Sequence, residues 1–342
     1  MKPCTLAFST CLWIFAVTAV TDKTAHADAI SDFYTGKTVR IINWAEAGGE
    51  YDVHGRLVSR YLGKHIPGQP AVVHQTMTGG GGIVAANYHF NIAPKDGTSL
   101  AILVGTLALF QAFGDKAIKF DAAQFQWIGT IASTKENVVA WHTSSVKSFE
   151  DLRTHDFITG ASGRSSPSFM VPTLMNQLLG TRIKIVPGYP GGSQINVAME
   201  RGEVHGRYNT WSSWKVTKPD WLRDKKITVL VHQALAAPAD NPGPPLLIDL
   251  AKTEDDKRIF ELMAIGSEMG RPLAATPGIP PDRLQALIGA YKKMLADPEF
   301  VAEAAKLNIE IDPIIGDDMQ KLVVRALSTP ASVVDRMKKL LE

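Results

Sequence analysis

The stretch VRIINWAEAGGEYDVHGRLVSRYLGK, residues 39–64, contains the repeating unit from which the fold is predicted. Residues 39–42 are a short β-branched run that favours a strand, and the glycines at 48 and 49 end it. From residue 51 to residue 64 the apolar side chains recur at helical spacing, at Val53, Leu57, Val58, Tyr61 and Leu62. Strand, glycine loop and helix in this order are typical of a sheet with parallel strands.

The same unit occurs four times along the chain, with glycine- or serine-rich loops between strand and helix at residues 44–50, 78–82, 160–168 and 188–193. Further strands are predicted at 71–73, 99–104, 127–132, 137–141, 157–159, 182–186 and 203–208. The series restarts near residue 130. We therefore expect an α/β fold with two lobes, each a mainly parallel sheet flanked by helices.

The lobe boundaries follow from that restart. Residues 28–130 form the first part of lobe 1, residues 131–227 form lobe 2, and residues 228–342 return to lobe 1 and add C-terminal helices. The apolar strand predicted at 227–232 is taken as the return, and a short strand is predicted at 309–311.

The N-terminus has the features of a cleavable export signal. Lys2 supplies a positive charge, residues 5–20 are uncharged and mostly apolar, and Ala25-His26-Ala27 has the small residues that a signal peptidase needs. We expect a signal peptide over residues 1–27, cleavage after Ala27 and a periplasmic protein. A retained membrane anchor is the alternative; a lipoprotein attached through Cys11 fits less well, because Cys11 lies inside the apolar run.

Composition argues against cysteine-dependent sites and against nucleic-acid binding. The two cysteines, Cys4 and Cys11, both precede the predicted cleavage site, so a mature chain would have no disulfide, thiol nucleophile or cysteine-bound metal. The formal net charge is only +2 and basic clusters are missing, which argues against a nucleic-acid partner. We expect a monomer without a cofactor or metal.

The four loops predict an anion-binding cleft. In a parallel sheet such loops lie at the carboxyl edge, where ligands bind. Each offers unpaired N–H groups at the start of a helix, where the partial charge is positive. Two loops from each lobe would hold a carboxylate in one shared crevice.

An ordered series of motifs extends this hypothesis. It comprises YTGKTVRII at 34–42, AGG at 47–49 with Tyr51-Asp52, MTGGGG at 77–82, APKDGT at 93–98, GYPGGS at 188–193, ERGEV at 200–204 and PGIP at 277–280. The series resembles the tripartite tricarboxylate transporter receptors, also called the TctC or Bug family, over nearly all of the mature chain. The resemblance implies a periplasmic-binding-protein fold of the Venus flytrap, type II-like kind. It also implies capture of a small organic acid and delivery to membrane permease subunits.

The resemblance and the loop residues of this chain together give the candidate ligand-binding residues. In lobe 1 they are Trp44, Ala47, Gly48, Gly49, Tyr51, Asp52, Gly80, Gly81 and Thr106, and in lobe 2 they are Ser162, Gly163, Arg164, Ser165, Ser166, Tyr189, Gly191, Gly192 and Arg207.

Some of these positions depart from the family pattern. Trp44 precedes the first glycine pair, and Glu50 follows it directly, where a carboxylate opposes a dianionic ligand. Arg164 and Arg207 are candidates for bidentate pairing with a ligand carboxylate, or solvated surface arginines. Trp44 either stacks on a ligand ring or is an ordinary packed aromatic.

The sequence gives less support to an enzymatic function. Ser144-Ser-Val-Lys147 has the spacing of a Ser–Lys pair, but it leads into a helix cap and the companion motifs are missing. The loop at 160–164 ends in Arg where a nucleophile elbow needs Gly, and no histidine pair has zinc-ligand spacing. We therefore expect no catalytic residues. A ligand sensor that feeds a signalling partner shares the same fold and stays open as an alternative, with a secreted hydrolase as the remote one.

Overall fold

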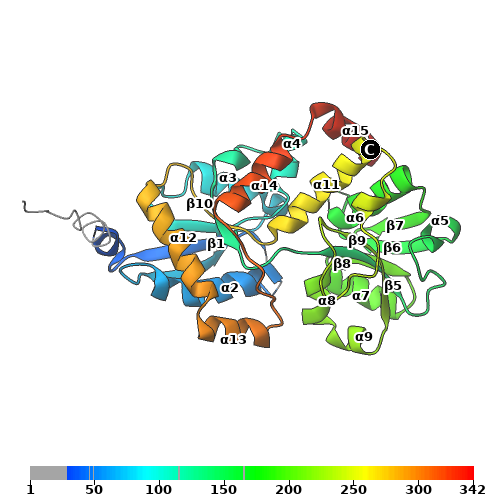
Figure 1. Ribbon diagram of the computed structural model, residues 1–342, viewed down its shortest axis with the longest axis horizontal. Coiled ribbons are helices and arrows are strands. Elements are labelled where there is room, and N and C mark those ends of the chain that lie inside the picture. The colour runs from blue at the N-terminus through cyan, green and yellow to red at the C-terminus, as the bar shows by residue number, and fades with distance from the viewer. Residues whose placement is uncertain (1–28, 46, 49, 115, 165) are drawn as a thin grey trace, which may run out of the picture.

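The computed structural model describes residues 29–45, 47–48, 50–114, 116–164 and 166–342. It has two α/β lobes, each built on its own sheet and flanked by helices (Figure 1). The predicted signal peptide, and with it the cleavage after Ala27, lies outside the described residues. Among the described helices none has the length and apolar character needed to cross a bilayer.

The first sheet has six strands, in the spatial order β11 (Ile314–Ile315), β4 (Gln126–Thr130), β10 (Leu273–Ala275), β3 (Ser99–Ile102), β1 (Thr38–Asn43) and β2 (Ala71–Thr76). The strands β1, β2 and β3 are parallel, whereas β10 and β11 pair antiparallel with their neighbours. The sheet is thus mixed, with a parallel block that carries the two predicted glycine loops of this lobe.

Helices cover both faces of the first sheet. Alternate residues of β1 face opposite cores: Ile41 lies in one cluster and Ile42 in another. One face is covered by α2 (Glu50–Leu62), α12 (Pro281–Leu295) and α13 (Pro298–Lys306), and the other by α3 (Ile83–Asn91), α4 (Leu107–Ala112) and α14 (Asp317–Leu327).

The second sheet has five strands, in the spatial order β7 (Ile183–Pro187), β6 (Phe157–Ala161), β8 (Gly206–Thr210), β5 (Glu136–Trp141) and β9 (Ile227–Gln233). Its parallel block is β6, β7 and β8. One face packs on α7 (Gly192–Glu200), α8 (Trp211–Thr217) and α9 (Pro219–Arg223). The lobe also contains α5 (Asp151–Thr154), α6 (Pro167–Leu174) and α10 (Leu247–Leu250).

Several local predictions need correction. The strand predicted at 227–232 is β9, but it pairs with β5 in the second sheet, so it is not the return to lobe 1. Its apolar residues could pack in either sheet, and an apolar pattern alone does not determine which strand it pairs with. The strand predicted at 309–311 lies at 314–315, and that at 203–208 begins at 206.

The return instead passes through α11 (Glu254–Met269), which contacts β9 and also α4 and α14. The C-terminal helix α15 (Ala331–Leu341) packs against α6 and α11 (Figure 1). One hydrophobic cluster therefore runs through both lobes on this side of the molecule, from Leu103 and Phe125 to Phe157 and Met170. The described chain passes between the lobes at 131–135, through α11, and between α14 and α15.

Candidate functional site

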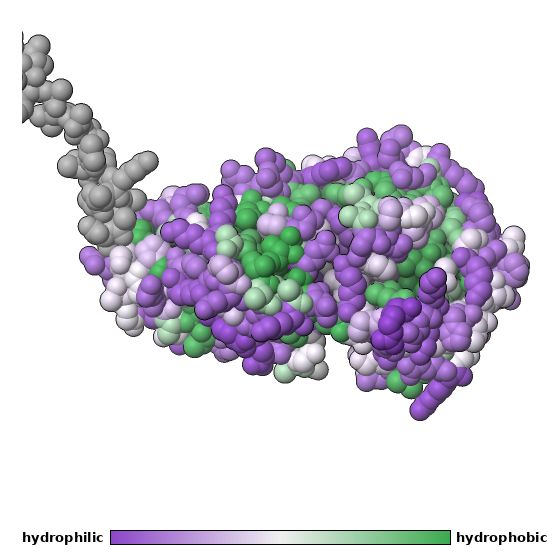
Figure 2. Space-filling view, turned by 60° about the horizontal axis from the view of Figure 1, so that its bottom comes forward, coloured by the Kyte–Doolittle hydropathy of each residue, from purple (hydrophilic) through white to green (hydrophobic). Residues whose placement is uncertain are grey.

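The carboxyl edges of the two parallel blocks face one another. β4 runs in the same direction as β3, because both pair antiparallel with β10, so Thr130 ends at the edge where β1 to β3 end. Residues 131–135 then lead to Glu136, which is paired with Thr210 at the end of β8. The loops after β1 and β2 thus lie opposite the loops after β6 and β7. Figure 2 shows the surface hollowed between the lobes.

The first glycine loop is held by its own helix. The N–H of Gly48 donates to Oδ2 of Asp52 at 2.9 Å, and Arg56 Nε donates to the same carboxylate. Burial alone would raise the pKa of Asp52, but the hydrogen bonds from Arg56 and Gly48 lower it below its usual value. Asp52 therefore orders this loop and occupies the Gly48 amide. Ala47 is exposed, and Gly49 lies outside the described residues.

The second glycine loop requires glycine at four successive positions. Residues 79–82 all have positive φ, at 129°, 55°, 62° and 100°, a region that L side chains adopt only under strain. Gly80 and Gly81 are exposed at the edge of the cleft, and a Cβ on Gly81 would meet open space.

Trp44 is packed rather than free to stack on a ligand. Its ring meets that of Tyr51 edge-on at 4.8 Å, and a Cβ on Gly82 would touch it at 3.3 Å. This arrangement favours the interpretation of Trp44 as a packed aromatic. Thr106 precedes α4, and its methyl group faces Gly266 of α11.

The loop after β6 is closed by serine hydroxyls. The N–H of Ser162 donates to Ser168 Oγ at 3.3 Å, and Ser166 Oγ donates to the Gly163 carbonyl at 2.7 Å. A Cβ on Gly163 would meet open space. Arg164 is exposed, with its guanidinium 5.3 Å from the centre of the Phe169 ring. Ser165 lies outside the described residues.

The loop after β7 leads into α7 over a buried arginine. Tyr189 is half-buried against Gly160, and Gly191 has extended backbone before the first turn of the helix. Arg207 of β8 is only 8% exposed, so the alternative of a solvated surface arginine is wrong for this residue. It donates to the Gly192 carbonyl at 2.6 Å and to Asn196 Oδ1 at 2.9 Å. Burial lowers the pKa of Arg207 to about 10.

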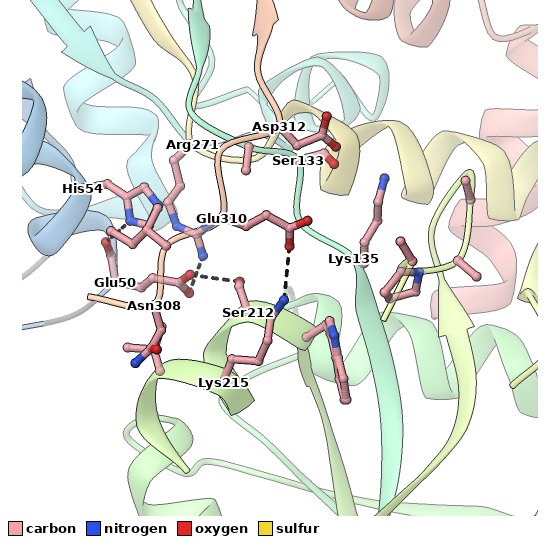
Figure 3. A pocket seen from close by; sticks show the side chains of 18 residues that line it. Glu50, His54, Ser133, Lys135, Ser212, Lys215, Arg271, Asn308, Glu310 and Asp312 are labelled. Atoms are coloured by element: carbon pink, nitrogen blue, oxygen red, sulfur yellow. Dashed lines mark hydrogen bonds and ion pairs between the residues drawn. The ribbon is translucent and has the colours of Figure 1, made fainter. Parts of the chain in front are cut away.

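A pocket of about 240 Å³ lies between the lobes (Figure 3). None of the described candidate ligand-binding residues lines it, and of the four predicted loops only the first contributes to its wall, through Glu50. Lobe 1 contributes Glu50, His54, Arg271 and residues 308–310 and 312, while lobe 2 contributes Trp211, Ser212, Lys215 and Val216. Ala132, Ser133, Lys135 and residues 236–239 complete its wall. The sequence pointed to Glu50 but missed the other charged residues of the pocket, which come from distant segments of the chain.

Glu50 joins the two lobes inside this pocket. Its carboxylate pairs with the buried guanidinium of Arg271 and accepts from Ser212 Oγ on α8 at 3.0 Å. Arg271 also lies over the Tyr51 ring at 5.4 Å. The charge of Glu50 is thus compensated within the protein, which the sequence did not predict.

Burial also sets the protonation states around Glu50. It lowers the pKa of His54 to about 4, with a further contribution from Arg271, so this imidazole is neutral at physiological pH. His54 Nδ1 lies 2.8 Å from the Glu50 carbonyl, which makes it the donor.

The lysines of the pocket are paired as well. Lys215 of α8 contacts Glu310 of lobe 1 and Asp240, each at 3.1 Å, and Lys135 pairs with Glu268 at 3.1 Å. The Lys215–Glu310 pair is a second contact between the lobes.

Catalytic and metal chemistry gain no support from the geometry. Lys147 Nζ donates to the His142 carbonyl, and Ser144 Oγ accepts from the Val146 N–H, so each is engaged with the backbone. Within the described ranges no group of three metal-binding side chains occurs.

Comparison with known proteins adds the fold family. No protein-family model matches this chain, and no curated protein matches it. Among solved structures, it resembles a TctC solute-binding protein from Polaromonas, without ligand, with a TM-score of 0.67 and 16% identity over 89% of this chain and 99% of that one. It also resembles MatC from Rhodopseudomonas palustris with bound malate, with a TM-score of 0.62 and 19% identity over 90% and 99% of the two chains.

An adipate-bound protein of R. palustris gives a TM-score of 0.63 and 18% identity over 89% of this chain and 97% of that one. At these identities the likeness shows a shared fold: the chain has the two-lobed architecture of TctC and Bug periplasmic binding proteins.

Proposed function

We propose that this chain is an exported, periplasmic solute-binding protein of the tripartite tricarboxylate transporter type. It captures a small organic carboxylate between its lobes and delivers it to membrane permease subunits. It acts as a monomer and performs no catalysis. The solved structures with malate and adipate support this ligand class, and the signal-like sequence predicted at residues 1–27 supports the compartment.

One observation carries the proposal. The loops after β1, β2, β6 and β7 all leave the carboxyl edges of their sheets, and a Cβ placed on Gly81 of lobe 1, or on Gly163 or Gly188 of lobe 2, would meet open space. Such bare backbone on both walls is what a ligand oxygen needs for close approach.

Ligand binding is tested on the mature chain with a thermal-shift screen of monocarboxylates, dicarboxylates, hydroxy acids and amino acids, followed by calorimetry. A ligand at 100 times its Kd adds about 2.7 kcal/mol to the free energy of unfolding. Small-angle scattering with a hit should show a smaller radius of gyration as the lobes close. A screen without any binding acid contradicts the proposal.

A matched pair of glycine variants locates the site. Gly163→Val extends a side chain into open space of the cleft without a clash and should abolish binding while the fold persists. Gly289→Val, on α12, also enters open space but lies outside the cleft and should bind as the wild type does. Equal affinity of both variants would remove the loop after β6 from the site.

Export and delivery need separate measurements. The mass of the protein recovered from the periplasm should correspond to a chain that starts at Asp28. Uptake of the identified acid by cells should require this chain together with its permease, and uptake that persists after its deletion would contradict the transport role.

A further inference from the structure

The wall of the pocket between the lobes holds one positive charge in a fixed place. Arg271 lies two residues beyond the end of α11, and its N–H donates to Thr130 Oγ1 at 3.2 Å. A Cβ on Gly270 would come within 2.3 Å of the Ala132 carbonyl oxygen, so the backbone before Arg271 packs tightly on the first connection between the lobes. The guanidinium lies over the Tyr51 ring at 5.4 Å, and the residue is only 8% exposed.

Such a buried guanidinium is costly unless an anion compensates it. Among the described residues, the carboxylate that pairs with Arg271 is that of Glu50, and Arg271 Nε is buried without a partner. The nearby carboxyl of Glu136 compensates little, because burial raises its pKa. The charge of Arg271 therefore depends mainly on Glu50.

The carboxylate of Glu50 also accepts a hydrogen bond from the opposite lobe. Its Oε2 pairs with Arg271, whereas its Oε1 accepts from Ser212 Oγ on α8 at 3.0 Å. Figure 3 shows the Glu50 side chain between these two residues. A buried guanidinium on one lobe and a hydroxyl on the other are donors that suit a captured carboxylate. Here a carboxylate of the chain itself takes that place.

The second contact between the lobes is more open to solvent. The side chains of Lys215 and Glu310 are 25% and 61% exposed, whereas those of Arg271 and Glu50 are 6% and 21% exposed. Salt screens exposed ion pairs strongly and buried pairs much less. The contact through Glu50 should therefore be the stronger of the two.

We propose that Glu50 is an internal ligand of the pocket between the lobes. Its carboxylate occupies an anion site formed by Arg271 of lobe 1 and Ser212 of lobe 2, and it holds the lobes together when no solute is bound. A free carboxylate reaches Arg271 only by displacing Glu50. This inference goes beyond the proposed function, because none of the described candidate ligand-binding residues lines this pocket.

Removal of the internal ligand should create a site for a free one. Glu50→Ala deletes a methylene and a carboxylate, which are the heavy atoms of acetate, and leaves Arg271 without its partner. The variant should melt at least about 3 °C below the wild type. Acetate should restore at least half of this loss relative to chloride at the same ionic strength, because it binds the folded chain. Acetamide has the same shape without the charge and should restore none of it. Calorimetric melting over a concentration series measures these shifts.

Three matched variants locate the acetate effect. Glu50→Gln fills the same space without a charge, and the double variant Glu50→Ala/Arg271→Met also lacks the cation. Glu303→Ala deletes a carboxylate from α13, where Glu303 accepts from Tyr61 at 2.6 Å. None of the three should gain more from acetate than the wild type does, so any acetate bound elsewhere in the cleft is subtracted.

The link between the lobes has a separate measurement that does not depend on the stability of Glu50→Ala. Ser212→Ala removes the donor of lobe 2 and keeps the buried ion pair, so the chain should stay folded. Its radius of gyration without solute should exceed that of the wild type in high salt, which screens the Lys215–Glu310 pair. Thr217→Val removes an exposed hydroxyl from the same helix, where it donates to the Ser213 carbonyl, and should keep the wild-type radius.

The outcomes decide the inference without the transported solute. It is wrong if Glu50→Ala gains no more from acetate than the wild type, if Glu50→Gln or the double variant gains as much as Glu50→Ala, or if Ser212→Ala keeps the wild-type radius. A Glu50→Ala chain that folds only with acetate supports it, and if that variant folds under no condition the radius of Ser212→Ala decides. Each of these failures leaves the proposed function standing, and a screen in which no acid binds leaves the internal ligand standing.

Discussion

His89 of α3 makes the stability of this fold sensitive to mild acid. The ring is fully buried, stacks on Phe125 with 6.0 Å between ring centres, and its Nε2 lies 3.2 Å from the Ala274 carbonyl. Nε2 is therefore the protonated nitrogen, and the buried Nδ1 has no partner among the described groups. Burial lowers the pKa of His89 from 6.5 to about 4.

The sign and size of the effect follow from this difference. Well above pH 6.5 neither state of the chain is protonated at His89, so the full stability is present. As the pH falls from 6.5 towards 4, His89 becomes protonated in the unfolded chain but stays neutral in the folded chain. Each pH unit then removes about 1.4 kcal/mol from the free energy of unfolding, which amounts to about 2 kcal/mol by pH 5.

His89→Gln should remove this loss, because a glutamine amide still donates to the Ala274 carbonyl and does not titrate. At pH 7 the variant should be less stable by about 1 kcal/mol, since it loses the ring contact with Phe125. Between pH 7 and pH 5 its free energy of unfolding should fall by about 2 kcal/mol less than that of the wild type.

Urea unfolding followed by circular dichroism at both pH values measures this difference. His155→Gln replaces an exposed histidine and should give the wild-type curve. Parallel pH profiles for His89→Gln and the wild type would refute the reasoning.

Three further predictions concern a buried carboxyl group, a glycine loop and an ion pair between the lobes. Burial raises the pKa of Glu136, whose carboxylate accepts hydrogen bonds from Tyr208 and Ser267. The folded protein therefore loses stability as the pH rises through the folded-state pKa of Glu136. Glu136→Gln should raise the urea midpoint at pH 7, and an unchanged or lower midpoint would contradict this. Gly82→Ala should cost about 1–3 kcal/mol by the same measurement, because φ is 100° there and Trp44 lies close by. Lys215→Met breaks the ion pair with Glu310 between the lobes. The free energy of unfolding should change by at most about 1 kcal/mol, but the radius of gyration without ligand should increase. A constant radius of gyration would show that the pair does not hold the lobes together.

Much of the local structure was predictable from the sequence. The β1–loop–α2 unit was recognisable because β-branched residues, two glycines and a helical apolar spacing follow one another within residues 39–64. The parallel pairing of β1 with β2 and of β6 with β7 then places all four loops at carboxyl edges, as predicted.

The long-range partners were not predictable in this way. The apolar pattern of β9 is the same whichever sheet it joins, and nothing near Glu50 indicates that Arg271 will compensate it. The burial of Arg207 had one signal: Gly192 is the residue whose missing side chain leaves room for the guanidinium. Such a signal gains its meaning only when the two residues are placed together.

The three passages between the lobes restrict how this molecule can move. A chain joined at one point swivels freely, but here residues 131–135, α11 and the connection from α14 to α15 all link the same two bodies, and a continuous core seals one side. Twisting one lobe against the other would stretch one of these connections and compress another. The easiest motion is therefore a bend that opens the side of the molecule opposite the continuous core. Ligand capture then reduces to a single angle. One spectroscopic label on each lobe is enough to follow it.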